Sequence, residues 1–140
     1  MVTHNPIRKR SPYSIYQQVA AVNRMFPGSC KRMGKHTLKC RCQITPSDLS
    51  ATYTVEIKYK VGRSPRVYVR KPTLIPCPKG KLPHVYTPDN RLCLFYPEDR
   101  SWTDQMLLAD TILPWTSEWL FYYELWSVNG YEWLGGGIEH

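Results

Sequence analysis

The chain is organised around residues 82–94, which read Leu-Pro-His-Val-Tyr-Thr-Pro-Asp-Asn-Arg-Leu-Cys-Leu. They lie in a segment, Pro72 to Pro97, that holds six prolines in 26 residues. Proline has no backbone N–H, so such a segment forms neither a helix nor a central strand. Irregular connections of this length in a compact domain are usually functional. We therefore expect a stiff loop that carries Cys93 as a candidate nucleophile.

Before the loop, the sequence predicts an N-terminal helix. Ser11 fits the N-cap position and Pro12 the first helical position. Apolar residues then recur at helical spacing as far as Phe26, and Pro27-Gly28 stops the helix and reverses the chain. The next residues, 29–35, are expected to form a basic loop.

Three strands are predicted between this helix and the loop. Residues 37–44 alternate strictly, with Cys40 and Cys42 on the apolar face. Residues 53–60 alternate in the same way, and residues 66–70 form a third, shorter β-type segment. Short turns join the three, which favours an antiparallel meander.

After the loop, two helices are predicted. Thr103 is expected to cap the first, and Pro114 to break it. The second should begin at Thr116 or Ser117 and run to Trp126 with apolar groups on most sides, which is typical of a helix packed on more than one face.

Composition predicts one globular domain over residues 1–140, with 42% hydrophobic residues and no apolar run close to the roughly 20 residues that span a bilayer. The N-terminal basic residues are not followed by an apolar segment, so we expect no secretory signal and a cytoplasmic location. In that compartment the five cysteines should remain reduced, without a disulfide framework.

Charge is distributed unevenly along the chain. All 19 Lys and Arg lie in residues 1–100 with five of the 11 acids, whereas residues 101–140 hold the other six acids and all five tryptophans. The two parts are therefore expected to contact different partners or each other.

Cys93 has two possible roles. A free cysteine is commonly a small buried hydrophobic residue. A thiol with an ordinary pKa of about 8.5 is also a few per cent thiolate at neutral pH, enough to attack an activated acyl group. His84 and Asn90 are the polar residues of the same loop that could stabilise an oxyanion. Their alternative roles are bracing of the loop by His84 and turn formation by Asn90.

Other classes of site are less well supported. Cys30, Cys40, Cys42 and His36 do not have the spacing of a zinc knuckle, so no metal or other cofactor is expected. The basic surface between Arg8 and Lys81 could bind nucleic acid, but an RNA-binding aromatic motif is missing. Nucleic acid is therefore the alternative and not the expected partner.

The order of these parts resembles ubiquitin-conjugating enzymes. The segments that carry the resemblance are residues 82–86, Leu92-Cys93-Leu94 and Trp102-Thr103. More closely, residues 110–120, Asp-Thr-Ile-Leu-Pro-Trp-Thr-Ser-Glu-Trp-Leu, resemble the stand-alone bacterial members found in operons for cyclic-oligonucleotide-based antiphage signalling (CBASS). The resemblance implies an α+β ubiquitin-conjugating-like fold, with an N-terminal helix, an antiparallel meander, a proline-rich active-site loop and C-terminal helices.

The same resemblance implies a function. Cys93 would form a thioester with the C-terminal glycine of a cyclic-nucleotide-synthesising nucleotidyltransferase and pass that glycine to an amine. The position that the family gives to an oxyanion-binding asparagine holds His84 here, so the aminolysis step should differ from that of its relatives. By resemblance, the N-terminal residues Arg8, Lys9 and Arg10 would contact an activating enzyme where one is encoded. The alternatives are a nucleic-acid-binding module and a catalytically inactive docking scaffold.

Overall fold

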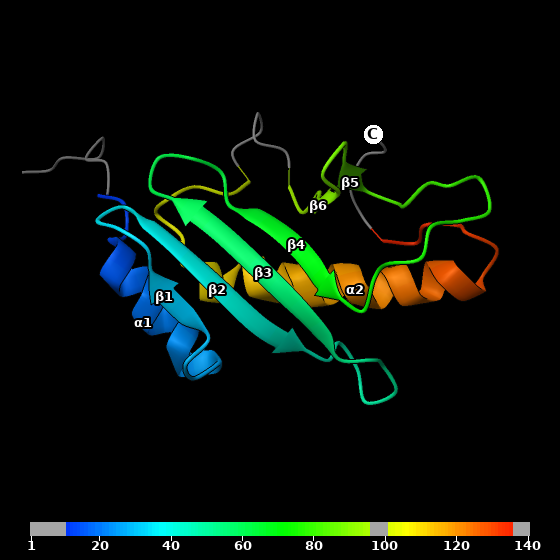
Figure 1. The fold of residues 1–140 in the computed structure, drawn as a ribbon, viewed down its shortest axis with the longest axis horizontal. Helices are drawn as coiled ribbons and strands as arrows, with labels where there is room; N and C mark the ends of the chain where they lie inside the picture. Colours follow the sequence, from blue (N-terminus) through cyan, green and yellow to red (C-terminus); the bar gives the residue numbers. More distant parts are fainter. Residues whose placement is uncertain (1–10, 96–100, 136–140) are drawn as a thin grey trace, which may run out of the picture.

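The computed structural model describes residues 11–95 and 101–135, and this part of the chain is α+β (Figure 1). The elements, in chain order, are α1 (Ile15–Met25), β1 (Cys30–Arg32), β2 (Thr37–Ile44), β3 (Tyr53–Lys60), β4 (Arg66–Lys71), β5 (Val85–Tyr86), β6 (Arg91–Leu92), the 3-10 helix η2 (Leu108–Asp110) and α2 (Ile112–Val128). None of the described helices combines the length and the apolar character needed to cross a membrane.

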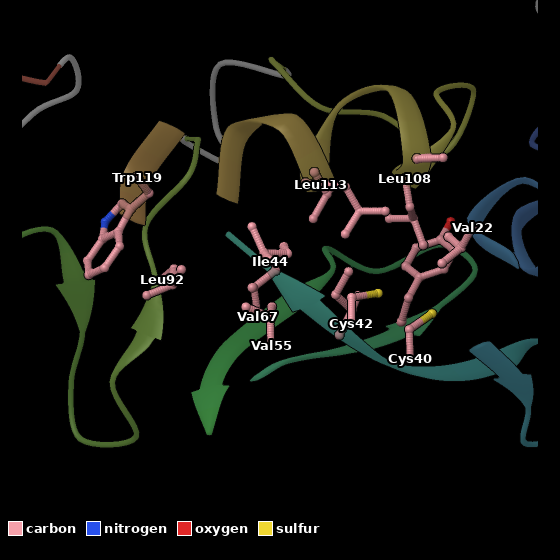
Figure 2. Packing of buried hydrophobic residues seen from close by; sticks show 14 of the residues in the cluster. Val22, Cys40, Cys42, Ile44, Val55, Val67, Leu92, Leu108, Leu113 and Trp119 are labelled. Atoms are coloured by element: carbon pink, nitrogen blue, oxygen red, sulfur yellow. The ribbon is translucent and has the colours of Figure 1, made fainter. Parts of the chain in front are cut away.

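The main sheet is an antiparallel meander in the order β1-β2-β3-β4, and a separate pair is formed by β5 and β6. Figure 1 shows α2 running behind the main sheet, whose other face is turned to the viewer. Strict alternation in β2 and β3 buries one row of side chains against the helices, as the sequence predicts. Figure 2 shows part of the resulting core, in which Cys40, Cys42 and Ile44 lie beneath Leu108 and Leu113.

The N-terminal helix begins three residues later than predicted. Ser14, and not Ser11, is its N-cap: the Ser14 hydroxyl accepts from the backbone N–H of Gln17 at 3.1 Å. The Gln17 side chain accepts from the Ser14 backbone N–H at 2.8 Å, which completes a capping box. This reciprocal pair satisfies the backbone N–H groups of Ser14 and Gln17 at the helix start. A start at Ser11 and Pro12 would not form this pair. The predicted end of the helix is confirmed, since α1 stops at Met25.

The predicted basic loop over residues 29–35 is wrong in part, because its first residues form β1 and pair with β2. This register sets Cys30 directly opposite Cys40, with 4.0 Å between their Cα atoms, and the two cysteines form a disulfide. The expectation that all thiols are reduced is therefore also wrong. Composition could not indicate this pair, because the strand that brings the two residues together is too short to show periodicity.

The predicted break at Pro114 is wrong, because a single helix, α2, runs through it. Pro114 occupies the first turn, where a backbone N–H has no partner within the helix, so a proline costs little there. Thr116 is accordingly not a cap: it is fully buried, and its hydroxyl donates to the Ile112 carbonyl at 2.7 Å. Thr103 begins a turn and not a helix, since its carbonyl accepts from the backbone N–H of Met106 at 3.0 Å.

A buried glutamine, Gln18, links α1 to the segment before α2 by two hydrogen bonds. The Gln18 amide donates to the Met106 carbonyl at 2.9 Å and accepts from the backbone N–H of Leu108 at 2.9 Å. A fully buried amide is tolerated because both of its ends are bonded. The helices therefore hold a fixed position beneath the sheet.

Candidate active site

The β5–β6 hairpin places Cys93 opposite His84. Val85 pairs with Leu92 in its ladder, and both side chains are buried. The next pair outward is His84 and Cys93, where the Cys93 backbone N–H donates to the His84 carbonyl at 3.0 Å. Two of the predicted site residues, nine positions apart in the sequence, thus face each other at the open end of the hairpin.

Cys93 is half-buried and lies outside the disulfide. It follows the buried Leu92, and the next residue, Leu94, is only partly buried. Cys93 therefore lies at the boundary between the buried core and the exposed surface, on a backbone that the hairpin holds. A fully buried cysteine would have favoured the inactive-scaffold alternative.

The backbone of His84 is held from two sides. Its φ of 43° lies in the left-handed region that few residues other than glycine adopt. Its carbonyl accepts from Cys93 and, at 3.1 Å, from the indole Nε1 of Trp119 on α2. Both lone pairs of the carbonyl are used. These two hydrogen bonds help to offset the cost of the left-handed backbone conformation, which is about 1–3 kcal/mol. The hairpin is thereby anchored to the C-terminal helix.

The His84 side chain is buried beneath an aromatic cluster. Its ring lies 4.8 Å from the ring of Trp133, tilted by 30°. Trp133 in turn lies 5.7 Å from Trp119 and 6.1 Å from Tyr122, measured between ring centroids. The acidic, tryptophan-rich end of the chain therefore covers one side of the candidate site. Sequence reasoning missed Trp119 and Trp133, although the concentration of tryptophan after residue 100 could have indicated them.

Asn90 lies in the turn at the other end of the hairpin and not beside Cys93. Its φ is 61°, its side chain is exposed, and its backbone N–H donates to the Tyr86 carbonyl at 2.8 Å. Asparagine is one of the few residues that adopt this conformation readily. This position favours the turn-forming role over direct contact with a reacting group. The neighbouring Asp89 ties the turn to β4 by accepting from the Tyr68 hydroxyl at 3.0 Å.

Two further thiols are present besides Cys93. Cys42 is buried in β2, and burial raises the pKa of its thiol. Cys77 lies in a turn, where its backbone N–H donates to the Lys81 carbonyl at 2.9 Å. A backbone hydrogen bond at Lys81 is the main cause that lowers the pKa of the Cys77 thiol. The lowered pKa favours the thiolate form of Cys77, which makes Cys77 a necessary control in any assay on Cys93.

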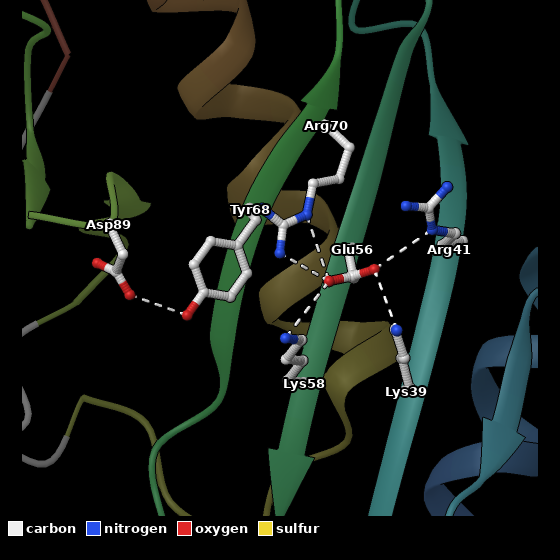
Figure 3. Close-up of polar contacts among 7 residues, drawn as sticks. All are labelled: Lys39, Arg41, Glu56, Lys58, Tyr68, Arg70 and Asp89. Carbon is white, nitrogen blue, oxygen red and sulfur yellow. Dashed lines mark hydrogen bonds and ion pairs between the residues drawn. The ribbon is translucent and has the colours of Figure 1, made fainter. Parts of the chain in front are cut away.

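The solvent-facing side of the sheet carries a cluster of cations around one carboxylate (Figure 3). Glu56 of β3 is only 3% exposed, and the four cations within 4 Å of its carboxylate are Lys39, Arg41, Lys58 and Arg70. Burial alone would raise the pKa of Glu56, but hydrogen bonds from Arg70 and Arg41 outweigh it and lower the pKa. The surplus of positive charge makes this face of the sheet strongly basic.

Arg8, Lys9 and Arg10, the predicted contacts for an activating enzyme, lie outside the described residues. Within residues 11–95 and 101–135, no group of three or more His, Cys, Asp or Glu side chains is placed to hold a metal ion.

The family model for the Type II CBASS E2 protein matches residues 18–140, which include both His84 and Cys93. A search of curated proteins finds none that matches.

Proposed function

Because the chain belongs to the Type II CBASS E2 protein family, which suggests a role in CBASS antiphage defence, we propose that it is a cysteine-dependent acyl transferase. Cys93 forms a thioester with the C-terminal glycine of a partner protein and passes that glycine to an amine. The observation that carries this proposal is the fixed, half-exposed position of Cys93 opposite His84.

The first step transfers the glycine acyl group to the Cys93 thiol. The Cys93 thiolate attacks the carbonyl carbon of a glycine already activated as a thioester or acyl adenylate, and the original leaving group departs with the electron pair of its bond. In the second step an amine attacks the new thioester. The Cys93 thiolate leaves, and the amine loses its proton to solvent as the amide forms. Neither step needs a metal or a cofactor beyond the activated donor.

His84 is proposed to position the reacting cysteine. Its carbonyl binds the Cys93 backbone N–H, and its ring packs on Trp133. A ring held in this way can also donate a hydrogen bond to the tetrahedral oxyanion, a contribution of about 3 kcal/mol where such donors are in place. The arrangement supports the orienting role most directly, since packing and backbone bonds both restrict His84. Asn90 contributes by shaping the turn.

The donor is proposed to be a cyclic-nucleotide-synthesising nucleotidyltransferase, through its C-terminal glycine. The residues before β1, including Arg8 to Arg10, are proposed to contact an activating enzyme where one is present. The α+β arrangement, with a helix before a four-stranded meander and a long helix after the cysteine, supports a ubiquitin-conjugating-like fold. One core cluster spans α1, the sheet and α2, which supports a single domain. A cytoplasmic location is proposed together with this function.

The test is the formation of a thiol-sensitive adduct. The protein is co-expressed with the synthase and with an activating enzyme that supplies the activated glycine, and the mixture is analysed by non-reducing gel electrophoresis and mass spectrometry. We expect an adduct on Cys93 that reductant removes, that Cys93→Ser converts to a reductant-resistant ester, and that Cys93→Ala abolishes. The matched control, Cys77→Ser, should retain the adduct.

The same assay also tests the identity of the acyl donor. A synthase that lacks its terminal glycine should give no adduct with the wild-type chain. An adduct that persists in Cys93→Ala, or that moves to Cys77, would show that the nucleophile is misassigned. An adduct that survives loss of the glycine would show that the donor is wrong.

A further inference from the structure

A basic pocket lies beside the hairpin, between the turn that joins β3 to β4 and the residues that flank Cys93. Its volume is about 470 Å³. The basic residues that line it are Lys58, Lys60, Arg63, Arg66 and Arg91. Among the residues that the structure describes, no acidic side chain lines it. We infer that this basic pocket binds a small phosphate-bearing molecule, of the class of nucleoside phosphates.

Charge balance points to an anion. Within the described part of the chain, no ion pair involves Lys60, Arg63 or Arg66. Three like charges that share one concave surface repel each other, and a multivalent anion removes that repulsion.

The two remaining cations are only partly neutralised. Lys58 lies 3.8 Å from Glu56, but three other cations share that carboxylate. Arg91 pairs with Asp89 at 3.4 Å, in a contact where both side chains are more than a third exposed. Such a pair is weak in water, so Arg91 is available to a ligand. The pocket as a whole therefore keeps a large positive charge.

The arginines favour phosphate over other anions. A guanidinium group binds two oxygens of a phosphate at once, and three of the five cations are arginines. Arg63 lies in the exposed turn after Gly62, and Arg66 begins β4. Both side chains are exposed, so binding a ligand requires no rearrangement of the core.

The pocket also has groups that suit a flat ring. Its lining includes Tyr86, Leu94 and Phe95, all partly buried. The Arg91 guanidinium lies over the Tyr86 ring, 4.6 Å from its centroid, and guanidinium and aromatic faces of this kind stack on nucleobases. The volume is in the usual range for small-molecule sites, about 300–1,000 Å³. These features favour a nucleoside phosphate over inorganic phosphate, and a small molecule over an extended polymer.

Cys93 does not line the basic pocket, although its neighbours Leu92 and Leu94 do. A ligand here would therefore contact the residues on either side of the nucleophile and not Cys93 itself. The proposal is consequently independent of the acyl-transfer reaction, and Cys93→Ala should bind the ligand as well as the wild type does.

Titration calorimetry on the full chain at 50 mM NaCl tests the inference with three probes: ATP, pyrophosphate and adenosine. We expect ATP to bind most tightly, pyrophosphate at least threefold more weakly, and adenosine not measurably. The double variant Arg63→Gln/Arg66→Gln should weaken ATP binding at least tenfold. The control Lys31→Gln/Lys79→Gln removes two exposed charges outside the basic pocket and should change the affinity less than twofold.

Several results would overturn the inference. If none of the probes binds at millimolar concentration, there is no such site. An equal loss of ATP affinity in the two double variants would mean that ATP binding depends only on the net charge of the protein. Tighter binding of an acidic peptide or of single-stranded RNA than of ATP would assign the surface to a macromolecule. Thermal unfolding of both variants confirms that each is folded before titration.

Discussion

Replacing Glu56 with glutamine should lower the free energy of unfolding by about 2 kcal/mol at pH 7. Glutamine has almost the same shape as glutamate, so the change removes the charge and leaves the packing of β3 intact. Four cations then remain around a neutral group on the solvent-facing side of the sheet (Figure 3).

The magnitude follows from the exposure of the partners. The N–O distances run from 2.8 Å for Arg70 to 3.8 Å for Lys58, but the partner side chains are 38–56% exposed. Water screens such pairs, so each is worth about 0.2–1 kcal/mol and not the larger value of a buried pair. Four pairs sharing one carboxylate then sum to about 1–4 kcal/mol, and the short, two-nitrogen contact from Arg70 supplies the largest part.

The pH dependence gives a second, sharper test. The pKa of Glu56 is lowered in the folded protein, so its stabilising effect is complete above the ordinary glutamate pKa and is lost as pH falls through the folded value. The gap in stability between wild type and Glu56→Gln should therefore narrow at acid pH, where the wild-type carboxyl is also neutral.

Urea denaturation followed by tryptophan fluorescence, at pH 7 and again at pH 3, measures both effects. The matched control is Glu118→Gln, which removes a charge from an exposed position on α2 and should change the stability by less than about 0.5 kcal/mol. A loss for Glu56→Gln no larger than that of the control, or a gap that stays constant between the two pH values, would refute the electrostatic account.

Three further substitutions probe the packing around the candidate site. Trp119→Phe removes the donor to the His84 carbonyl. It should lower the free energy of unfolding, measured by urea denaturation, by about 1–3 kcal/mol, and should slow adduct formation on Cys93. An unchanged rate of adduct formation would show that this hydrogen bond does not position the cysteine. Gly135→Ala places a methyl group 2.9 Å from the Trp133 indole, and should displace that ring from His84 with a shift in tryptophan fluorescence. Tyr59→Phe removes a buried hydroxyl that has no hydrogen-bond partner among the described residues. The free energy of unfolding of this variant should be between 0 and about 1 kcal/mol higher than that of the wild type. Burial, and secondarily Asp104, raises the pKa of Tyr59 to about 12 in the folded protein, so the tyrosine ionises first in the unfolded state. The wild type, but not Tyr59→Phe, should therefore lose stability as pH rises from 10 through 12.

Part of the fold could be predicted from local pattern. Strict alternation defined β2 and β3, and short turns implied their antiparallel pairing. The hydrophobic period and the stop at Pro27-Gly28 located the end of α1. The predictions that failed concern features that local pattern does not specify. The start of α1 depended on a reciprocal bond between Ser14 and Gln17, and β1 is too short to show a period.

The candidate site divides in the same way. The proline-rich loop and its leucine-flanked cysteine singled out Cys93 and His84, because proline density and residue type are properties of the sequence itself. Tertiary structure alone decided that the two face each other and that Asn90 does not join them, since a hairpin register is a matter of backbone pairing. It also decided that Trp119 and Trp133 cover His84 and that Cys30 meets Cys40, because residues distant in the chain become neighbours only when the sheet and α2 pack together.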